Sequence, residues 1–480
     1  MSLGKHLVSA TLQLTLSNAM VRLLSLVTMP LLTRLLPPDA YGTAAIAGTM
    51  ISLVSGLALS GMEMSYARAY HANVAPSGAV VEAFAWRYAM GAGLAAAGIG
   101  AIAWWLLLAD TFELPGYLAG LLGVGILLSV ANTMSQTRAR LNNRYRLMSM
   151  SIVASSIGVL AVSIGVALWW RRDELPLILS MVVGYLIPVL MLGMPTCAVL
   201  CKASGLSPES RVNVIKIGLA GTVTAPMYWV ISSLDRWFLG YYQDAASVGI
   251  YSIGYSVAIM GTMVNNALTS VWLPEASRAF ENNQEEAKVQ LGHLAERLIA
   301  GLAVVWLAIT AAGGDAVRLL ASPQFHDASV VVPYIAGAIF FHGVLQLANA
   351  GLLLKNKLHN SVWWWLAGAA LCVAMNMLLV PTLGRLGAAI TQTAAFALVA
   401  IGIVINSQRL FPVKLRTIRL TGIIFAVLPL GMLMQSAWSG TPWTSLLIKL
   451  PVGVMVALLV FEFMAPNVLR GLAKKYLTQN

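Results

Sequence analysis

The stretch TRLLPPDAYGTAAIAGTMISLVSGLALSGMEMSYAR, residues 33–68, decides which class of fold the chain belongs to. Arg34 and a Pro-Pro-Asp turn precede an apolar run at about 41–63, and Arg68 follows it. A run of about 20 mostly apolar residues is long enough to cross the hydrocarbon core of a bilayer as a helix. The stretch therefore predicts one transmembrane helix with polar flanks.

The composition extends this prediction to the whole chain. Hydrophobic residues make up 59% of the 480 positions, and only 10% of positions are charged, against roughly 25% in soluble globular proteins. A soluble enzyme is excluded because it would lack the polar residues to cover its surface. An outer-membrane barrel is disfavoured because the apolar stretches are continuous and long. We expect an all-α polytopic membrane protein.

Polar residues, Pro and Gly divide the chain into about fourteen apolar segments, which predict about 14 transmembrane helices. The segments lie at about 8–33, 41–63, 80–108, 115–137, 147–170, 175–201, 213–234, 246–271, 294–314, 328–353, 360–381, 384–407, 418–437 and 443–465. The longest polar connection lies at about 275–293. Its first part, EASRAFENNQEEAK, has no Pro or Gly, so we expect a continuous surface helix there.

Lys and Arg are distributed unevenly between the two sides that these segments define. Twenty-two lie on one side and six on the other, while Arg22 and Lys449 fall inside predicted spans. Because cytoplasmic loops carry an excess of Lys and Arg, both termini are predicted to be cytoplasmic. We expect Lys449 to snorkel to the interface. Topology and contact with membrane lipids account for most of the +12 net charge, so no nucleic-acid partner is expected.

A weak internal repeat predicts how the helices are grouped. The stretch DRWFLGYYQDAASVGIYSIGYSVAIMGTMVNNALTSVWLPEASR, residues 235–278, resembles 33–68 in its Arg, its acidic loop and its small-residue-rich span. The copies are about six spans apart, and an even number of spans gives them the same orientation. We predict an N-terminal six-helix lobe at 1–205 and a C-terminal six-helix lobe at 206–408, in a pseudo-two-fold arrangement. An extra pair of transmembrane helices and a cytoplasmic tail follow at 409–480.

Polar residues inside predicted spans are the candidates for a binding cavity, because such residues are costly in a membrane. In the first span, Thr15, Asn18, Arg22 and Ser25 share one helix face. Arg22 is the deepest cation, and it either faces a cavity or is a structural residue that neighbouring carbonyl groups satisfy. Further candidates are Tyr228, Asp235 and Arg236 in the seventh span and His342, Gln346 and Asn349 in the tenth.

Each of these further candidates also has a structural interpretation. Asp235 can neutralise Arg236 near the outer interface, and the polar residues of the tenth span can bridge helices. Glu63 lies close to Arg68, which favours a salt bridge over a proton-carrying role. Cys197, Cys201 and Cys372 lie in apolar stretches and are expected to be packing residues.

The sequence contains none of the motifs that soluble enzymes of the common classes require. It has no GxxxxGK[ST] phosphate loop, no HExxH and no paired carboxylates in a plausible cleft. We therefore predict no catalytic residue, no cofactor and no metal. A polytopic chain with polar stripes, a repeat and no nucleotide site is typical of a secondary transporter or flippase.

Two motifs resemble signatures of a known family. TRLLPPDAYGTAA (33–45) resembles the N-terminal signature of bacterial polysaccharide flippases, and LDRWFLGYYQDAASVGIYSIGYSV (234–257) resembles their mid-chain signature. With the fourteen-span layout, the chain is similar to the Wzx-type polysaccharide transporter branch of the multidrug/oligosaccharidyl-lipid/polysaccharide exporter superfamily. The resemblance covers nearly the whole chain.

The resemblance implies a function and a location. Such flippases move undecaprenyl-pyrophosphate-linked oligosaccharide from the cytoplasmic to the periplasmic leaflet of the inner membrane by alternating access, for O-antigen, exopolysaccharide or capsule. A polysaccharide polymerase and chain-length machinery are the partners this implies, and Arg22 and Arg236 fit its cationic cavity. The alternative is a MATE-like exporter of organic cations, which would need a deep carboxylate, whereas Glu63 and Asp235 lie toward span ends.

Overall fold

The computed structural model describes residues 27–70, 78–108, 115–201, 207–355, 357–436 and 441–464, together with 205 and six positions between 13 and 25. Every regular element in these ranges is helical, as the sequence predicts. Ten helices are long and apolar enough to cross a membrane, and shorter apolar stretches lie at Ile424–Ser436 and Pro442–Val456. The polytopic helical class is confirmed. The count of fourteen stays a prediction, because half of the first predicted span lies outside the described residues.

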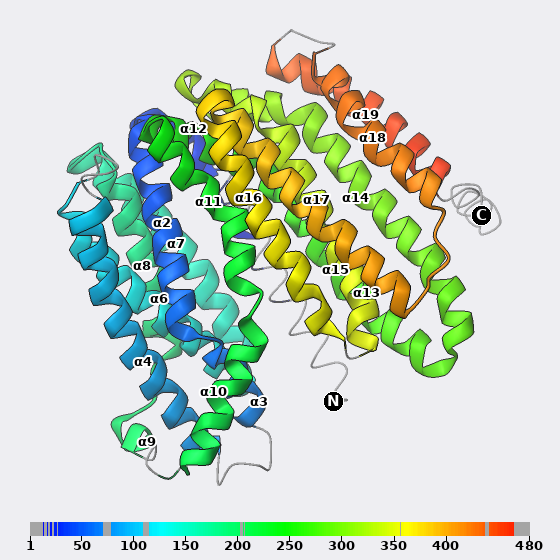
Figure 1. Cartoon of the computed structure of the whole chain (residues 1–480). Helices are drawn as coiled ribbons and strands as arrows, with labels where there is room; N and C mark the ends of the chain where they lie inside the picture. Colours follow the sequence, from blue (N-terminus) through cyan, green and yellow to red (C-terminus); the bar gives the residue numbers. More distant parts are fainter. Residues whose placement is uncertain are drawn as a thin grey trace, which may run out of the picture. The chain divides into compact units, whose positions relative to one another are not determined.

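The chain forms two compact units, of which the first comprises Met1–Trp229 and Gln243–Gly249. Its helices are α2 (Pro38–Leu59), α3 (Met62–Tyr70), α4 (Gly78–Ala103) with the π-helix η1 (Trp104–Leu108), α6 (Leu118–Leu141), α7 (Tyr145–Trp169), α8 (Leu175–Leu192), α9 (Cys197–Leu200) and α10 (Pro208–Thr222). Helix α6 packs against α2, α4, α7 and α8 (Figure 1). The predicted boundaries 1–205, 206–408 and 409–480 stay a prediction.

A turn ends the helix of the second predicted span earlier than expected. The span was expected to reach residue 63, but α2 ends at Leu59. Ser60 and Gly61 follow with φ angles of 47° and 72°, a region that glycine adopts without a steric penalty. A Cβ on Gly61 would lie 2.3 Å from the carbonyl oxygen of Gly218 in α10. Glycine is therefore needed here both for the turn and for the close approach of α10.

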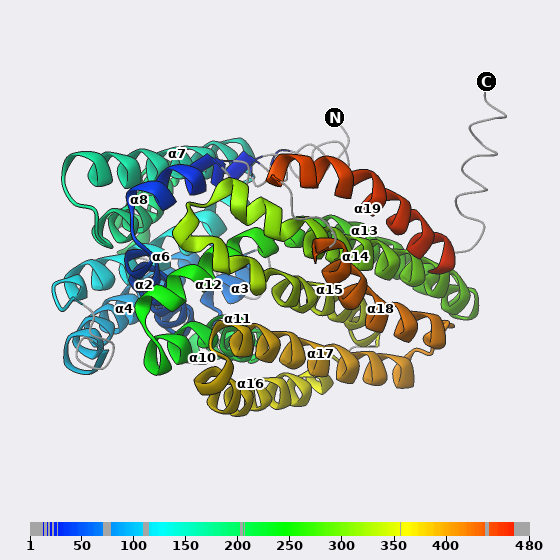
Figure 2. The same ribbon diagram turned by 90° about the horizontal axis from the view of Figure 1, so that it is seen from above.

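The second unit comprises Val230–Tyr242 and Ile250–Asn480. Helices α11 (Ala225–Tyr242) and α12 (Ala245–Ala258) have residues in both units. The others are η3 (Ile259–Gly261), α13 (Thr262–Asn282), α14 (Gln284–Leu320), η4 (Pro323–Val330), α15 (Val332–Leu354), η5 (Leu358–Ser361), α16 (Val362–Leu383), α17 (Arg385–Leu410), α18 (Thr417–Ser436) and α19 (Pro442–Met464). In Figures 1 and 2, α17 lies beside α15 and α16, and α14 beside α18 and α19.

Two predicted elements are interrupted in the structure. The predicted span 213–234 is divided, because α10 ends at Thr222 and α11 begins at Ala225. The predicted surface helix at 275–293 is also wrong as a single helix, because the backbone of Asn283 is extended, with φ −159° and ψ 110°. The Asn283 side-chain oxygen accepts hydrogen bonds from the backbone N–H groups of Glu285 and Glu286. Asn283 is therefore an N-cap that starts α14 anew.

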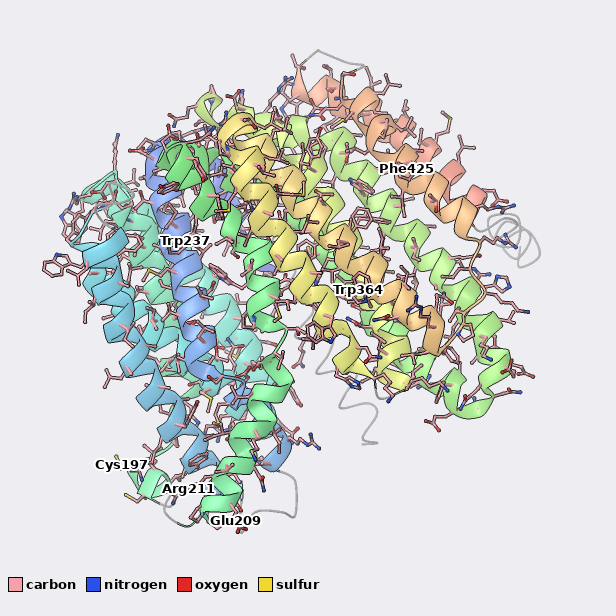
Figure 3. The ribbon with its side chains drawn as sticks, in the orientation of Figure 1. Cys197, Glu209, Arg211, Trp237, Trp364 and Phe425 are labelled. Atoms are coloured by element: carbon pink, nitrogen blue, oxygen red, sulfur yellow. The ribbon has the colours of Figure 1, made fainter. Side chains whose placement is uncertain are left out.

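Large apolar side chains are exposed on the outer helices of both units. Trp169 is 87% exposed and Phe425, which is labelled on α18 in Figure 3, is 76% exposed. Such side chains suit a helix surface that faces lipid. Of the predicted packing cysteines, Cys372 is buried as expected, whereas Cys197 and Cys201 are exposed (Figure 3). Cys197 begins the short helix α9 and Cys201 directly follows it.

Candidate functional site

Helix α11 places Asp235 and Arg236 in the interior of the second unit. The two residues are 1% and 7% exposed, so both are buried within the protein, and their predicted position near the outer membrane interface stays a prediction. Arg236 Nη1 lies 3.2 Å from Asp235 Oδ1 and donates a hydrogen bond of 3.1 Å to the carbonyl oxygen of Ser232, one turn earlier. A buried charge is tolerated when it is paired and hydrogen-bonded in this way.

Two tyrosines of α12 and one glutamine of α17 complete what we call the Asp235 cluster: Asp235, Arg236, Tyr251, Tyr255 and Gln392. The Tyr251 hydroxyl donates to Asp235 Oδ2, and the Gln392 amide lies 3.3 Å from the same hydroxyl. The Arg236 guanidinium carbon lies 4.3 Å from the ring centroid of Tyr255 and 5.7 Å from that of Tyr251. The cluster thus joins α11, α12 and α17 through one neutralised pair of charges.

Helix α16 extends this polar region. Asn376 donates to the carbonyl oxygen of Cys372, and Cys372 Sγ contacts the carbonyl oxygen of Val230 at 3.7 Å. Two buried oxygens, Asn376 Oδ1 of α16 and Thr391 Oγ1 of α17, have no hydrogen-bond partner in the part of the chain that the structure describes. Buried polar atoms without a protein partner are often satisfied by ordered water. Within the described residues, no group of three or more His, Cys, Asp and Glu side chains is suitable for a metal ion.

The predicted stripe on the tenth span lies on α15. His342, Gln346 and Asn349 are each partly buried. The His342 ring lies edge to face with Phe396 of α17 at 5.5 Å. Gln346 Oε1 is buried and has no hydrogen-bond partner among the described residues. This free acceptor distinguishes Gln346 from polar residues that only bridge helices.

The structure does not test the remaining candidates as part of a binding site. Thr15, Asn18 and Arg22 lie outside the described residues. Ser25 is exposed. Tyr228, at the start of α11, is 41% exposed and belongs to the first unit. Their predicted roles in binding stay predictions.

A second buried ion pair attaches the C-terminal helices to α14. Lys449 of α19 is 6% exposed, and its Nζ lies 2.8 Å from Asp315 Oδ2 and 3.0 Å from the carbonyl oxygen of Gln435. Ser445 donates to the same carboxylate oxygen at 2.8 Å. The prediction that Lys449 snorkels to the interface is therefore wrong. A partner 134 positions away in the chain replaces the water that the ammonium group would otherwise need.

The first unit holds a further, partly buried ion pair, at the end that the sequence predicts to be cytoplasmic. Arg138 Nε of α6 lies 2.6 Å from Glu82 Oε1 of α4. The expected salt bridge between Glu63 and Arg68 is not among the ion pairs of the described residues, and Glu63 Oε2 is buried without a partner.

Sequence reasoning missed Tyr251, Tyr255 and Asp315. The tyrosines carry a detectable signal, because they are four residues apart in the mid-chain motif and so share a helix face with their polar ends. Asp315 carries no such signal.

Comparison with solved structures identifies the fold. The fold is similar to the lipid II flippase MurJ in an inward closed conformation, with a TM-score of 0.74, 11% identity, and coverage of 95% of this chain and 99% of that chain. An inward-facing multidrug resistance MATE family transporter of the MOP superfamily gives a TM-score of 0.60 at 14% identity, over 84% of this chain and 95% of that chain. A eukaryotic MATE transporter, AtDTX14, gives a TM-score of 0.52 at 14% sequence identity, over 88% of this chain and 100% of that chain. The chain has the MurJ/MATE fold.

The family follows from the sequence itself. The family model described as "Polysaccharide biosynthesis protein" matches residues 31–329, more than half of the chain. This protein therefore belongs to that polysaccharide biosynthesis family, as the two motifs indicated. A search of curated protein sequences finds no match.

Proposed function

We propose that this protein is a flippase that moves undecaprenyl-pyrophosphate-linked oligosaccharide repeat units from the cytoplasmic to the periplasmic leaflet by alternating access. The observation that carries the proposal is the family match over 31–329, on a chain whose fold is similar over 95% of its length to a lipid II flippase. The product would serve cell-surface polysaccharide synthesis, as O-antigen, exopolysaccharide or capsule.

The chemistry of such a substrate fits the polar residues that the sequence and structure single out. The pyrophosphate needs a cation, and the planar guanidinium of Arg22 suits a bidentate contact with phosphate oxygens. Sugar hydroxyl groups need amide and imidazole partners, which the α15 stripe supplies with the unpaired Gln346 Oε1. Outward movement of an anionic head is favoured by about 2.3 kcal/mol per charge per 100 mV across an inside-negative membrane. The proposal therefore needs no nucleotide.

An exporter of organic cations is the second candidate, and the similarity to MATE transporters favours it. Such a carrier needs a carboxylate that is free to pair with its cargo. Of the five acidic residues that are buried in the described part of the chain, Asp235, Asp315 and Glu82 are each paired with a cation of the protein itself. Glu174 accepts a hydrogen bond from the Tyr117 hydroxyl, and Glu296 accepts one from the backbone N–H of Arg416. These pairings support the flippase over the cation exporter. Glu63, with its unpartnered Oε2, is the residue that tests the alternative.

In this proposal the protein lies in the bacterial inner membrane with both termini in the cytoplasm. A polysaccharide polymerase and chain-length machinery would act on the flipped repeat units. We assign the Asp235 cluster a positioning role in the second unit, because its charges neutralise each other.

The experiment uses a strain that lacks this protein and accumulates lipid-linked repeat units on the cytoplasmic side. We expect Arg22→Ala to fail to complement, Arg22→Lys to restore part of the flux, and the exposed control Arg140→Ala to restore all of it. Full complementation by Arg22→Ala would remove Arg22 from the mechanism. Loss of drug export in Glu63→Gln, without any change in the lipid-linked pool, would establish the cation exporter instead.

A further inference from the structure

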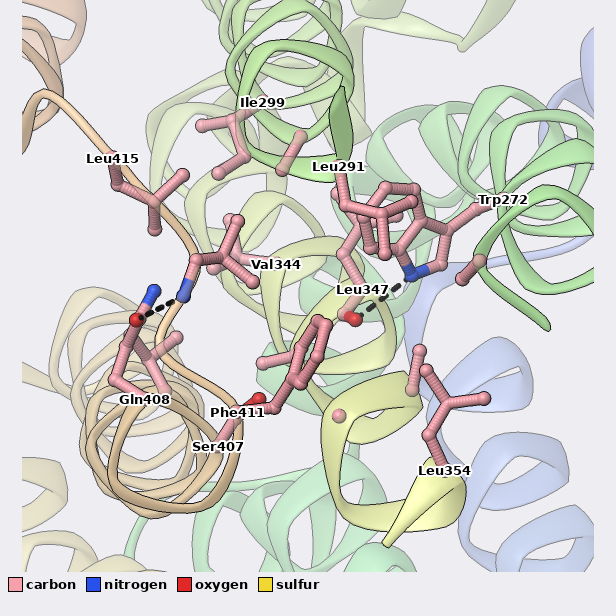
Figure 4. Close-up of a pocket in the computed structure, with 17 residues that line it drawn as sticks. Trp272, Leu291, Ile299, Val344, Leu347, Leu354, Ser407, Gln408, Phe411 and Leu415 are labelled. Carbon is pink, nitrogen blue, oxygen red and sulfur yellow. Dashed lines mark hydrogen bonds between the residues drawn. The ribbon is translucent and has the colours of Figure 1, made fainter. Parts of the chain in front are cut away.

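A pocket lies inside the second unit between α13, α14, α15 and α17 and the segment 411–415 that leads to α18 (Figure 4). Its volume is about 60 Å³, which is room for about four to six water-sized groups. Nearly all of the lining is apolar, with Ser407 and Gln408 as the polar exceptions. Figure 4 shows Trp272, Leu347 and Phe411 around the centre of the pocket.

Two polar side-chain atoms in the wall of this largely apolar pocket, Trp272 Nε1 and Gln408 Oε1, are hydrogen-bonded within the protein. Trp272 Nε1 donates to the carbonyl oxygen of Leu347 at 2.9 Å, and the backbone N–H of Val413 donates to Gln408 Oε1 at 2.9 Å (Figure 4). A site needs two to four free polar partners to hold water well. The pocket therefore favours hydrocarbon over water.

The segment that closes the pocket is fixed in place. The backbone N–H of Arg416 donates to Glu296 Oε1 at 2.7 Å, and that of Lys414 donates to the carbonyl oxygen of Lys288 at 3.3 Å. A Cβ on Gly292 of α14 would lie 2.4 Å from the Lys414 carbonyl oxygen. The segment thus lies directly on α14, and the pocket is a built feature of the second unit.

A cation lies at the edge of the pocket. Lys355 Nζ lies 4.9 Å from the ring centroid of Phe280 and 5.9 Å from that of Phe411, which lines the pocket. Its hydrogen bond of 3.1 Å goes to the neutral amide oxygen of Gln284. Among the ion pairs of the described residues Lys355 takes part in none, so its charge is available to an anion. The side on which it lies is the one where the sequence places twenty-two of the Lys and Arg residues.

We propose that this pocket binds an acyl chain of an anionic phospholipid, whose phosphate pairs with Lys355. The end of an unbranched chain fits a pocket of this size, whereas an isoprenoid carries a methyl branch on every isoprene unit and needs a wider groove. The ammonium group matches the single charge of a phosphodiester, and basic residues near a membrane surface attract anionic lipids. The lipid would hold α13, α15 and α17 together at this end of the second unit. The inference is independent of the proposed transport function.

The test is a lipid titration of the purified full-length protein in detergent, read as the rise in melting temperature. The probes are dioleoylphosphatidylglycerol, dioleoylphosphatidylcholine and undecaprenyl phosphate. We expect phosphatidylglycerol to stabilise the protein at the lowest concentration. Lys355→Gln should raise the concentration at half-effect about fivefold, and the control Lys357→Gln should leave it unchanged.

A second pair of variants tests the apolar part of the site. Ala348→Leu fills the pocket and should weaken the response to phosphatidylglycerol, whereas Leu353→Phe, at a position 39% exposed on the same helix, should not. If Ala348→Leu does not fold, the comparison of Lys355→Gln with Lys357→Gln decides whether the proposal holds. Equal effects of the two phospholipids, equal effects of the two lysine variants, or tighter binding of undecaprenyl phosphate would each overturn the proposal.

Discussion

Replacement of Arg236 by methionine tests whether the Asp235 cluster is a structural link. The guanidinium group lies 3.2 Å from Asp235 Oδ1, and the two residues are 7% and 1% exposed. In the variant, the buried carboxylate keeps only the Tyr251 hydroxyl and the backbone N–H at 236, which donates at 2.8 Å. Removal of one partner from a buried pair costs about 3–5 kcal/mol, because the other charge is left uncompensated.

The double variant Asp235→Asn/Arg236→Met distinguishes the cost of an unpaired buried charge from the cost of losing the Arg236 side-chain contacts. It removes both charges and keeps an acceptor for Tyr251, so the loss of stability should be smaller than in Arg236→Met alone. We expect a favourable coupling of about 2–3 kcal/mol between the two positions in a double-mutant cycle. The assay is denaturant unfolding of the purified protein in detergent, followed by circular dichroism.

The chain supplies a matched control for this cycle. Arg278 forms an ion pair with Glu275 at the same 3.2 Å, but the side chains are 74% and 50% exposed. Arg278→Met should cost about 0–1 kcal/mol, because exposed pairs contribute little. An Arg236→Met variant no less stable than Arg278→Met would refute the reasoning. A folded double variant that has lost all transport would show instead that Arg236 contacts the substrate.

Three further predictions concern other parts of the structure. Lys449→Met should destabilise the protein by about 3–5 kcal/mol, because Asp315 is left buried without its cation. In the same unfolding assay, the double variant Asp315→Asn/Lys449→Met should recover most of the lost stability. Asn283→Ala should cost about 1 kcal/mol through loss of the cap and should increase proteolysis between α13 and α14, whereas unchanged proteolysis would contradict the capping role. Gly42→Ala should lower the melting temperature sharply, because its Cβ would lie 1.7 Å from the carbonyl oxygen of Ala245, and a normal melting temperature would show that the helices can separate at little cost.

The positions of most helices could be predicted from apolar periodicity and length alone. The segments predicted at 360–381, 384–407 and 443–465 correspond closely to α16, α17 and α19. A membrane-crossing helix needs a long apolar run wherever its neighbours lie. The class of fold is therefore a local property of this sequence.

The interruptions and the buried charges could not be predicted in the same way. The turn at Ser60 and Gly61 depends on the approach of Gly218, more than 150 residues away in the chain. The sequence predicted that Lys449 reaches the membrane surface, because its partner Asp315 is 134 positions away in the chain and could not be recognised. Asp235 and Arg236 are adjacent and could be paired from the sequence, but their burial depends on α12 and α17. Residue identity shows that a charge needs a partner, whereas the fold determines which partner it finds.

The most direct test of the central claim is a flipping assay in proteoliposomes. Purified protein is reconstituted with fluorescent undecaprenyl-pyrophosphate-linked oligosaccharide, and a membrane-impermeant reagent quenches the label exposed in the outer leaflet. The account predicts that protein increases the quenched fraction beyond that of empty vesicles and that Arg22→Ala, reconstituted in equal amount, does not. Equal quenching with and without protein, together with transport of an organic cation by the same vesicles, would contradict it.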